Sequence, residues 1–416
     1  MTYEGAGEDL IFDWNVAGPQ AIPAPRHLEL DDESLRDGLQ SPSVRTPSID
    51  DKIRLLHLMD QLGIDTADIG LPGAGPHVLN DVKVLAREIA DGHLNIAANC
   101  AARTLKADID PIAEASQHAG IPIEACLFIG SSPIRQFAED WTLDSMLEHT
   151  ETAVSYAVSL GLPVMYVTED TTRARPETLE KLYICAIESG ARRICLADTV
   201  GHATPEGTYN LVSWACRLVE PIEPRVTIDW HGHNDRGLGV VNALTAGYAG
   251  ANRIHGTALG IGERVGNAAM DQILVNLKLM GWIDRDLTAL SDYCRLASEM
   301  TGVGIHETYP VMGADAFRTG TGVHAAAIIK AMKRGDAWLA DRVYSGVPAG
   351  DFGRRQIIEL GPMSGQSNVV FWLEARQIEP RPDLVEALFA ACKTAERVLS
   401  EEEATRIVAE RLAVTD

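Results

Sequence analysis

Short apolar runs alternate with longer amphipathic segments from about residue 27 to residue 282. The apolar runs have the length and composition of strands, and they lie at residues 27–30, 66–70, 95–99, 123–129, 163–167, 193–197, 226–230 and 253–258. The intervening segments have the apolar spacing of helices, most clearly at residues 49–62, 77–89, 143–160, 176–188, 205–219 and 242–249. Such alternation is typical of a parallel sheet covered by helices, and eight strands can close it. We therefore predict an α/β fold, a (β/α)8 TIM barrel.

The alternation stops after Met280. Segments 286–300, 323–334 and 381–413 keep helical spacing, and a stretch rich in glycine and proline, 345–365, lies between the last two. We expect three parts: an extended arm over residues 1–26, the catalytic barrel over 27–282, and helical subdomains over 283–416 that form a lid on the barrel mouth.

Composition excludes several classes of protein. Hydrophobic residues make up 46% of the 416-residue chain, and no run approaches the roughly 20 apolar residues that cross a bilayer. The formal net charge is -23, which opposes binding to nucleic acid and anionic membranes. We therefore expect a soluble protein that binds small molecules and neither nucleic acid nor membranes.

The cysteines and the N-terminus favour a cytoplasmic location. The seven cysteines are scattered without close pairs, as in proteins of a reducing compartment. The first residues carry Glu4, Glu8 and Asp9 rather than a basic start followed by an apolar run, so they do not resemble a secretory signal.

Polar residues gather where the predicted strands end. These residues are Asp31, Asp37, Asp68, Asn99, Arg103, Ser131, Ser132, Arg135, Glu169, Asp170, Asp198, Thr199, His231, His233, Asn234 and Asp235. In a TIM barrel the carboxyl ends of the strands and the loops after them hold the active site. Buried polar groups are costly, so this accumulation predicts an active site at that rim.

Asp37, His231 and His233 together predict a metal centre. One carboxylate and two imidazoles suit a divalent cation, and three protein ligands leave coordination positions open for a substrate oxygen. His231 and His233 alternate along one strand, so both face the same side. Arg36 is either a catalytic cation or the partner of an ordinary ion pair with its neighbour Asp37.

Three motifs resemble those of one family. They are Asp32-Glu33-Ser34-Leu35-Arg36-Asp37-Gly38-Leu39-Gln40, His231-Gly232-His233-Asn234-Asp235-Arg236-Gly237-Leu238-Gly239 and Gly260-Ile261-Gly262-Glu263-Arg264-Val265-Gly266-Asn267-Ala268, with Asp198-Thr199-Val200-Gly201 between the first two. Their order is similar to that in the metal-dependent TIM-barrel family of 2-isopropylmalate synthase, homocitrate synthase, citramalate synthase and hydroxymethylglutaryl-CoA lyase. The resemblance covers residues 27–280 and continues more loosely through Gly322-Val323-His324 and Ser364-Gly365.

The resemblance implies roles for individual residues. Asp37, His231 and His233 would bind zinc, magnesium or manganese, with Asn267 as a further ligand or a neighbour of the ligands. Arg36 would stabilise negative charge on a thioester oxygen, and Thr199 would hold the carboxylate of a 2-oxo acid. His324 matches a histidine that family synthases bring over the active site, often from the partner subunit, and Tyr344 corresponds to a tyrosine of the same lid. A homodimer is therefore expected.

The implied reaction is a Claisen-type condensation of acetyl-CoA, or another acyl-CoA, with a 2-oxo acid to give a 2-hydroxy-2-substituted dicarboxylic acid and CoA. An oxygen anion develops in this chemistry, which a divalent ion and a fixed guanidinium stabilise. His324 and Glu169 are the candidate acid–base groups. The alternative for Glu169 is a structural ion-pair cluster with Asp170 and Arg173. Gln40 and Arg103 are further candidates for substrate binding.

Two departures concern the acceptor. Ser132-Pro133-Ile134 is followed by Arg135 where isopropylmalate synthases carry histidine, and Asp68 stands where the family usually has glutamate. Arg135 is expected either to contact a second carboxylate of the substrate or to pair with a nearby acid. These departures leave the identity of the 2-oxo acid open.

The motifs favour a synthase over a lyase. Leu39 is similar to the lyase version of the first motif, but Asn234-Asp235 and Gly262-Glu263-Arg264 are similar to the synthase version, and residues 259–267 lack the reactive cysteine of the lyases. Retro-Claisen cleavage of a 3-hydroxyacyl-CoA, or a non-catalytic metabolite-binding barrel, are the alternatives. Because the sequence ends at Asp416, we do not expect the C-terminal regulatory domain of feedback-inhibited isopropylmalate synthases. The Gly260-Ile261-Gly262 pattern fits either a phosphate-binding loop or a tight turn.

Overall fold

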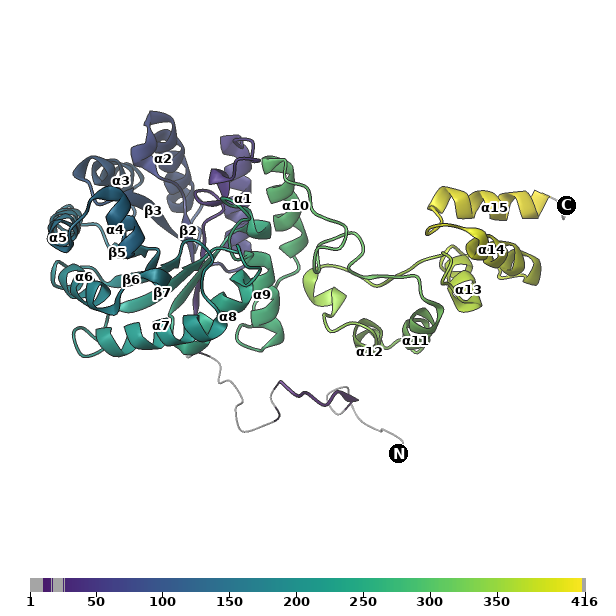
Figure 1. Ribbon diagram of the computed structural model, residues 1–416. Helices are drawn as coiled ribbons and strands as arrows, with labels where there is room; N and C mark the ends of the chain where they lie inside the picture. Colours follow the sequence, from purple (N-terminus) through teal and green to yellow (C-terminus); the bar gives the residue numbers. More distant parts are fainter. Residues whose placement is uncertain (1–9, 16, 18–24, 26, 414–416) are drawn as a thin grey trace. The chain divides into compact units, whose positions relative to one another are not determined.

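The computed structural model describes residues 10–15, 17, 25 and 27–413 (Figure 1). The chain forms two compact units, of which one is Ile22–Gly304 and the other holds the chain from Ile305 onward. Most of the arm expected over residues 1–26 lies outside the described residues. Within the described part, no helix combines the length and the apolar character needed to cross a bilayer.

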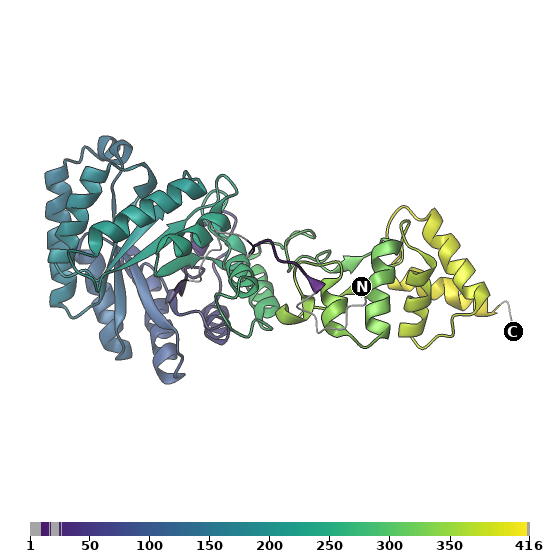
Figure 2. The ribbon, with the colours of Figure 1, turned by 90° about the horizontal axis from the view of Figure 1, so that it is seen from below.

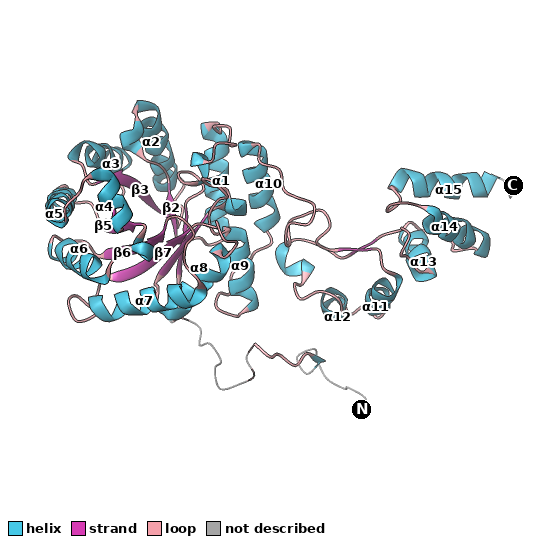
Figure 3. Ribbon diagram, in the orientation of Figure 1, coloured by secondary structure: helices cyan, strands magenta, loops and turns pink. Residues whose placement is uncertain are grey.

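The first unit is a closed barrel of eight parallel strands in sequence order (Figure 3). The strands are β1 Glu29–Asp32, β2 Thr66–Asp68, β3 Ala97–Arg103, β4 Ile123–Gly130, β5 Val164–Glu169, β6 Arg193–Asp198, β7 Thr227–Gly232 and β8 Arg253–Gly256. Pairing of β1 with β8 closes the barrel, with Asp31 opposite His255. The predicted fold class is confirmed.

Helices cover the outside of the barrel, one layer around the strands (Figure 2). They are α1 Ile49–Gln61, α2 Pro76–Asp91, α3 Lys106–Ala119, α4 Pro133–Glu139, α5 Leu143–Ser159, α6 Pro176–Glu188, α7 Pro205–Val219, α8 Gly239–Ala249 and α9 Met270–Leu279. Local sequence sets several of their starts, because Ser48 and Thr204 accept hydrogen bonds from the first turns of α1 and α7. Proline opens α2, α6 and α7, where the missing amide proton costs little.

Alternation along β1, β7 and β8 separates outward apolar residues from an inward polar face. Leu30, Trp230 and Ile254 are fully buried, and as neighbours of inward residues they face the helices. The interior instead carries charge, since Arg253 pairs there with Asp229 at 2.6 Å and Glu124 at 2.7 Å. The barrel mouth is therefore built on an ion-paired core.

The barrel unit extends beyond the boundary expected at residue 282. Helix α10, Leu290–Thr301, packs against α1 and belongs to this unit. Its Tyr293 is fully buried and donates its hydroxyl hydrogen to Asp32 at the end of β1. Because α10 buries its apolar face on the barrel, the unit ends at Gly304.

The second unit is mainly helical. Its elements are β9 Arg318–Thr319, α11 Gly322–Lys333, α12 Ala337–Arg342, η6 Ala349–Phe352, β10 Ile357–Ile358, α13 Gln366–Ala375, α14 Pro382–Thr394 and α15 Glu401–Ala413. The segment expected to be helical over 381–413 is two helices rather than one. The break occurs where the amide of Leu399 donates to the carbonyl of Leu360 and Ser400 accepts from the amide of Glu403.

Candidate active site

A cavity that is partly open to solvent lies at the carboxyl ends of the strands. Eight of the residues that the sequence singled out line it: Arg36, Asp37, Gln40, Asp68, Glu169, Thr199, His231 and His233. Its remaining wall is largely apolar and includes Leu71, Phe128, Met165 and Val167. A concave, mostly apolar site with a few convergent polar groups is the usual form of a small-molecule site.

Asp37, His231 and His233 converge in this cavity. Asp37 Oδ2 lies 3.8 Å from His231 Nε2 and 3.6 Å from His233 Nε2. One donor atom from each of the three residues lies within 4.8 Å of the other two. His231 belongs to β7 and His233 follows its end, so the local alternation turns both rings inward.

The surroundings of these donors fit a divalent ion. His233 Nδ1 and Asn267 Oδ1 are buried without a hydrogen-bond partner in the described structure. Burial opposes ionisation of Asp37, but Arg36 and His231 outweigh it and lower the pKa of the carboxyl. Burial together with the charge of His231 lowers the pKa of His233 to about 4. An ionised carboxylate beside a neutral imidazole is the form in which these groups bind metals.

The loop after β8 places Asn267 against the three donors. Its Nδ2 donates to Asp37 Oδ2, and the residue forms an antiparallel bridge with His233. Gly262 leaves the room for this amide, since a Cβ there would come within 2.6 Å of Asn267 Oδ1. Gly266, with φ of +93°, would place a Cβ 1.8 Å from the carbonyl oxygen of Gly260. Close packing of a tight turn therefore accounts for these glycines.

Arg36 is held by three carboxylates. Its guanidinium contacts Asp68 at 2.6 Å, Asp37 at 2.7 Å and Glu33 at 3.2 Å, and it lines the cavity. The ion pair with Asp37 is thus real, and it fixes the cation at the cavity wall. Burial raises the pKa of Asp68 to about 7 against the opposing charge of Arg36.

Glu169 faces the cavity, whereas its neighbour Asp170 serves structure. Arg173 makes two hydrogen bonds of 2.7 Å to Asp170. Arg135 lies 3.6 Å from Glu169 and 3.3 Å from Glu139. Burial raises the pKa of Glu169, and Arg135 partly offsets that rise. Arg135 is therefore in contact with a cavity-lining residue, Glu169, and is not itself among the described residues that line the cavity.

Thr199 and Gln40 stand at other points of the wall. Thr199 Oγ1 accepts a hydrogen bond of 2.8 Å from the amide of Asp170, which leaves its hydroxyl hydrogen available to an acceptor. Gln40, in η2 Gly38–Gln40, is exposed at the cavity edge.

Arg103 lies outside the lining of the cavity. It is absent from the described residues that line the cavity, and its guanidinium pairs with Asp108 through bonds of 2.7 and 2.9 Å. Its side chain is 60% exposed. The strand that carries it runs to Arg103 rather than ending at residue 99, which directs the side chain toward the start of α3.

His324 and Tyr344 belong to the second unit. Their rings stack with centroids 4.1 Å apart, and both line a polar recess with Arg318, Ser345 and Gln356. The two residues that the sequence assigned to one lid are therefore in contact within that unit.

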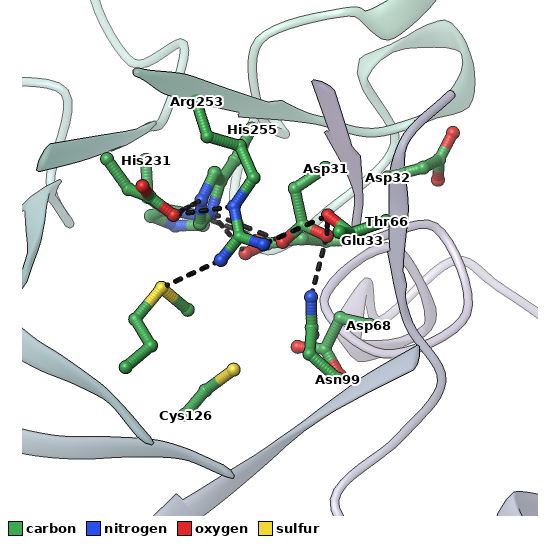
Figure 4. A network of polar contacts seen from close by, with 12 residues as sticks. Asp31, Asp32, Glu33, Thr66, Asp68, Asn99, Cys126, His231, Arg253 and His255 are labelled. Atoms are coloured by element: carbon green, nitrogen blue, oxygen red, sulfur yellow. Dashed lines mark hydrogen bonds and ion pairs between the residues drawn. The ribbon is translucent and has the colours of Figure 1, made fainter. Parts of the chain in front are cut away.

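Two residues of the site were not found from the sequence, Glu33 and His255. His255 Nδ1 and Nε2 lie 2.8 Å from Glu33 and 3.0 Å from Asp229; Figure 4 shows Glu33 with His231 and His255. Burial would lower the pKa of His255, but Asp31, Asp229 and Glu33 raise it to about 10. The signal was the alternation of Arg253 and His255 along β8, which puts two basic side chains inside the barrel.

Comparisons with known proteins identify a family and several relatives to which this chain is similar. The sequence model of a family described as HMGL-like matches residues 27–298. The probable 2-isopropylmalate synthase of Methanopyrus kandleri is 31% identical over 358 residues, covering 85% of this chain and 67% of that protein. Homocitrate synthase AksA of the same organism is 32% identical over 388 residues, covering 91% of each chain. The putative (R)-citramalate synthase CimA of Methanopyrus kandleri is 32% identical, and the match covers 64% of that protein.

Solved structures agree on the fold. The HMG-CoA lyase of Bacillus subtilis superposes with a TM-score of 0.55 at 22% identity, over 67% of this chain and 94% of that one. An HMG-CoA lyase in complex with coenzyme A and 3-methylmalate gives 0.55 at 23% identity, over 66% and 91%. At such identities the likeness concerns the barrel architecture.

Proposed function

The chain belongs to the HMGL-like family, and from this membership we propose that it catalyses a Claisen-type condensation of acetyl-CoA, or another acyl-CoA, with a 2-oxo acid. The products are a 2-hydroxy-2-substituted dicarboxylic acid and CoA. Relatives named as isopropylmalate, homocitrate and citramalate synthases support an acyltransferase of the synthase kind. The observation that carries the proposal is the convergence of Asp37, His231 and His233 beside the guanidinium of Arg36 in one cavity.

We assign divalent-ion binding to Asp37, His231 and His233, with Asn267 as a further ligand or a neighbour. Zinc, magnesium and manganese are the candidate ions. When bound, such an ion supplies Lewis-acid polarisation of a substrate oxygen.

Arg36 and Thr199 then orient the substrates. Arg36 donates to the thioester oxygen, on which negative charge grows as the acyl methyl loses a proton, and its carboxylate partners prevent reorientation during that step. Thr199 donates its free hydroxyl hydrogen to the carboxylate of the 2-oxo acid.

Glu169 is the proposed general base. It takes a proton from the methyl group of the acyl thioester, and the carbanion carbon forms the new bond to the keto carbon of the acceptor. The raised pKa of Glu169 brings its basicity closer to the working pH. His324 returns a proton to the resulting alkoxide, and Tyr344 holds its ring by stacking. Water then adds to the thioester carbon, whose bond to sulfur breaks, and CoA leaves as the thiol.

We assign binding of the side chain of the acceptor, the 2-oxo acid, to Arg135, Asp68 and Gln40. Arg135 is the cation proposed for a second carboxylate, because it contacts the cavity residue Glu169 as well as the exposed Glu139, whereas Arg103 pairs with Asp108. Asp68, shorter than the usual glutamate, contacts Arg36 at the cavity wall.

We further propose a homodimer acting in the cytoplasm, with the barrel as the catalytic part and the second unit as its lid. All seven cysteines lie in the described part and are free, which suits a reducing compartment. If the partner subunit supplies His324, mixing inactive D37N and H324A chains will restore activity through mixed dimers. Failure to restore it would contradict delivery between subunits.

The central test is CoA release. Purified protein is incubated with acetyl-CoA and a panel of 2-oxo acids, and free thiol is measured. We expect release with at least one acceptor, loss on chelation, and recovery when Zn²⁺, Mg²⁺ or Mn²⁺ is added. Activity that is indifferent to chelators would refute the metal assignment, and absence of thiol with every acceptor would favour a non-catalytic barrel.

A lyase is the alternative that Leu39 favours, because this residue matches the lyase version of the first motif. Incubation with 3-hydroxyacyl-CoA thioesters separates the two reactions. A lyase yields acetyl-CoA and an oxo product, whereas the synthase leaves these thioesters intact.

A further inference from the structure

The carboxylate of Glu33 lies between the rings of His231 and His255. Its Oε1 accepts from Nδ1 of His255 at 2.8 Å, and its Oε2 lies 2.8 Å from Nδ1 of His231 as an ion-pair contact rather than a well-directed hydrogen bond. The nitrogen of His231 that faces Asp37 is the other one, Nε2. Glu33 therefore contacts the ring nitrogen of His231 that lies opposite the proposed metal-binding nitrogen.

Glu33 has little freedom to move away. It follows β1, its amide donates to the carbonyl of Gly256 at 2.9 Å, and its side chain is 4% exposed. His255, which holds Oε1, is itself held by Asp229 at 3.0 Å. Closure of β1 on β8 thus sets where this carboxylate stands.

We propose that Glu33 is a positioning residue for His231. Its negative charge, 2.8 Å from Nδ1 of His231, favours the ring form that carries its proton on Nδ1. That form leaves the lone pair of Nε2 directed toward Asp37 and His233, which strengthens binding of the divalent ion. The inference rests on the proposed function, specifically on the assignment of His231 as a ligand. Its Oε2 also lies 3.2 Å from Arg36, so the same oxygen orients the guanidinium at the cavity wall.

A different use of these residues is a second metal site made of Glu33, His231 and His255, whose donor atoms also lie within 4.8 Å of one another. The contacts favour the positioning role. Both ring nitrogens of His255 already face carboxylate oxygens, and Arg36 places a positive charge against Glu33.

The test compares Glu33→Ala and Glu33→Gln with the control Glu124→Gln. Glu124 belongs to the same buried network through Arg253 and Arg193. Mn²⁺ alone is titrated into each full-length chain, with bound and free ion measured by electron paramagnetic resonance and folding checked by circular dichroism. We expect about 10- to 100-fold weaker binding in E33A and near wild-type affinity in E124Q. The loss in E33Q should be smaller than in E33A, because glutamine keeps the size of the side chain and one acceptor oxygen for the two imidazoles.

A second measurement does not depend on E33A folding. In metal-free wild-type chains labelled with ¹⁵N-histidine, at a pH at which His231 is neutral, we expect its proton on Nδ1, and in E33Q we expect a weaker or mixed preference. Unchanged Mn²⁺ affinity in folded E33A, or an unchanged tautomer in E33Q, would overturn the inference. Two Mn²⁺ ions per chain, with one lost in His255→Gln, would overturn it in favour of the second site. A wild-type chain that binds none of Mn²⁺, Zn²⁺ and Mg²⁺ would overturn the proposed function and the inference with it.

Discussion

Asp37 Oδ2 and His233 Nε2 lie 3.6 Å apart, although Asp37 follows the first strand of the barrel and His233 the seventh. This spacing leaves the two donor atoms facing one another across a position that an ion can share. Asn267 contacts the same carboxylate oxygen, so three separate loops meet at Asp37.

Replacing Asp37 with asparagine will remove the anionic donor while keeping the size of the side chain. We expect affinity for Mn²⁺ to fall by about 100-fold or more, because outer-shell changes alone already cost 10- to 100-fold, and CoA release to fall with it. Asp91→Asn, which alters an exposed ion pair with Arg87, is the matched control. Near-normal metal binding in D37N would contradict the ligand assignment.

Glu169→Gln tests the general base. We expect kcat to fall by about 10²- to 10⁴-fold with little change in KM, since proton transfer is lost and the shape of the wall is kept. Glu139→Gln also removes a carboxylate beside Arg135, but an exposed one, and serves as the control. Equal effects of the two substitutions would show that the role of Glu169 is only to hold Arg135.

Arg135→His tests whether Arg135 contributes to recognition of the acceptor 2-oxo acid. If Arg135 binds a second carboxylate, the preference for dicarboxylic over monocarboxylic 2-oxo acids should drop by about 10-fold or more, as expected for loss of a charge-assisted hydrogen bond. Values of kcat/KM across an acceptor panel measure the change. An unaltered panel would mean that this loop does not select the acceptor.

Arg103→Ala should leave kcat/KM within about twofold of wild type, because the residue is not part of the cavity wall and its buried partner Asp108 also accepts a hydrogen bond from the backbone amide of residue 103. Steady-state CoA release measures this. A large rise in KM for the 2-oxo acid would restore the substrate-binding role predicted from the sequence.

Asp32 gives the barrel a pH-dependent stability. Burial raises the pKa of this carboxyl from 3.8 to about 6, so between these values the folded state binds more protons than the unfolded chain. The free energy of unfolding contributed by Asp32 is therefore greatest at low pH and declines as pH rises through about 6, by about 3 kcal/mol at most.

Urea unfolding of wild type and Asp32→Asn between about pH 4 and pH 8 measures this contribution. The difference between the two curves should vary with pH in that window, since the amide does not titrate. Tyr293→Phe provides a second check. The hydroxyl of Tyr293 lowers the pKa of Asp32, so its removal should extend the decline to higher pH. Parallel curves for all three chains would rule out the assignment.

The barrel and its principal donors could be predicted because their signals are local. Strand and helix periods depend on neighbouring residues, and α6 and α7 begin and end at the predicted residues. His231 and His233 share a face because they alternate on one strand, which requires no knowledge of distant contacts.

Tertiary structure decided the rest. The contact of Glu33 with His255 depends on the register in which β1 meets β8, and that register joins opposite ends of the barrel sequence. Arg103 and Arg135 both follow predicted strands, yet the first pairs with Asp108 and only the second reaches a cavity residue. The amino-acid sequence by itself determined which elements form and which chemistry stands at the strand ends, because backbone periodicity is a property of neighbours. Which of those charged groups face one another was decided by barrel closure and side-chain packing, because burial selects ion pairs among residues far apart in the chain.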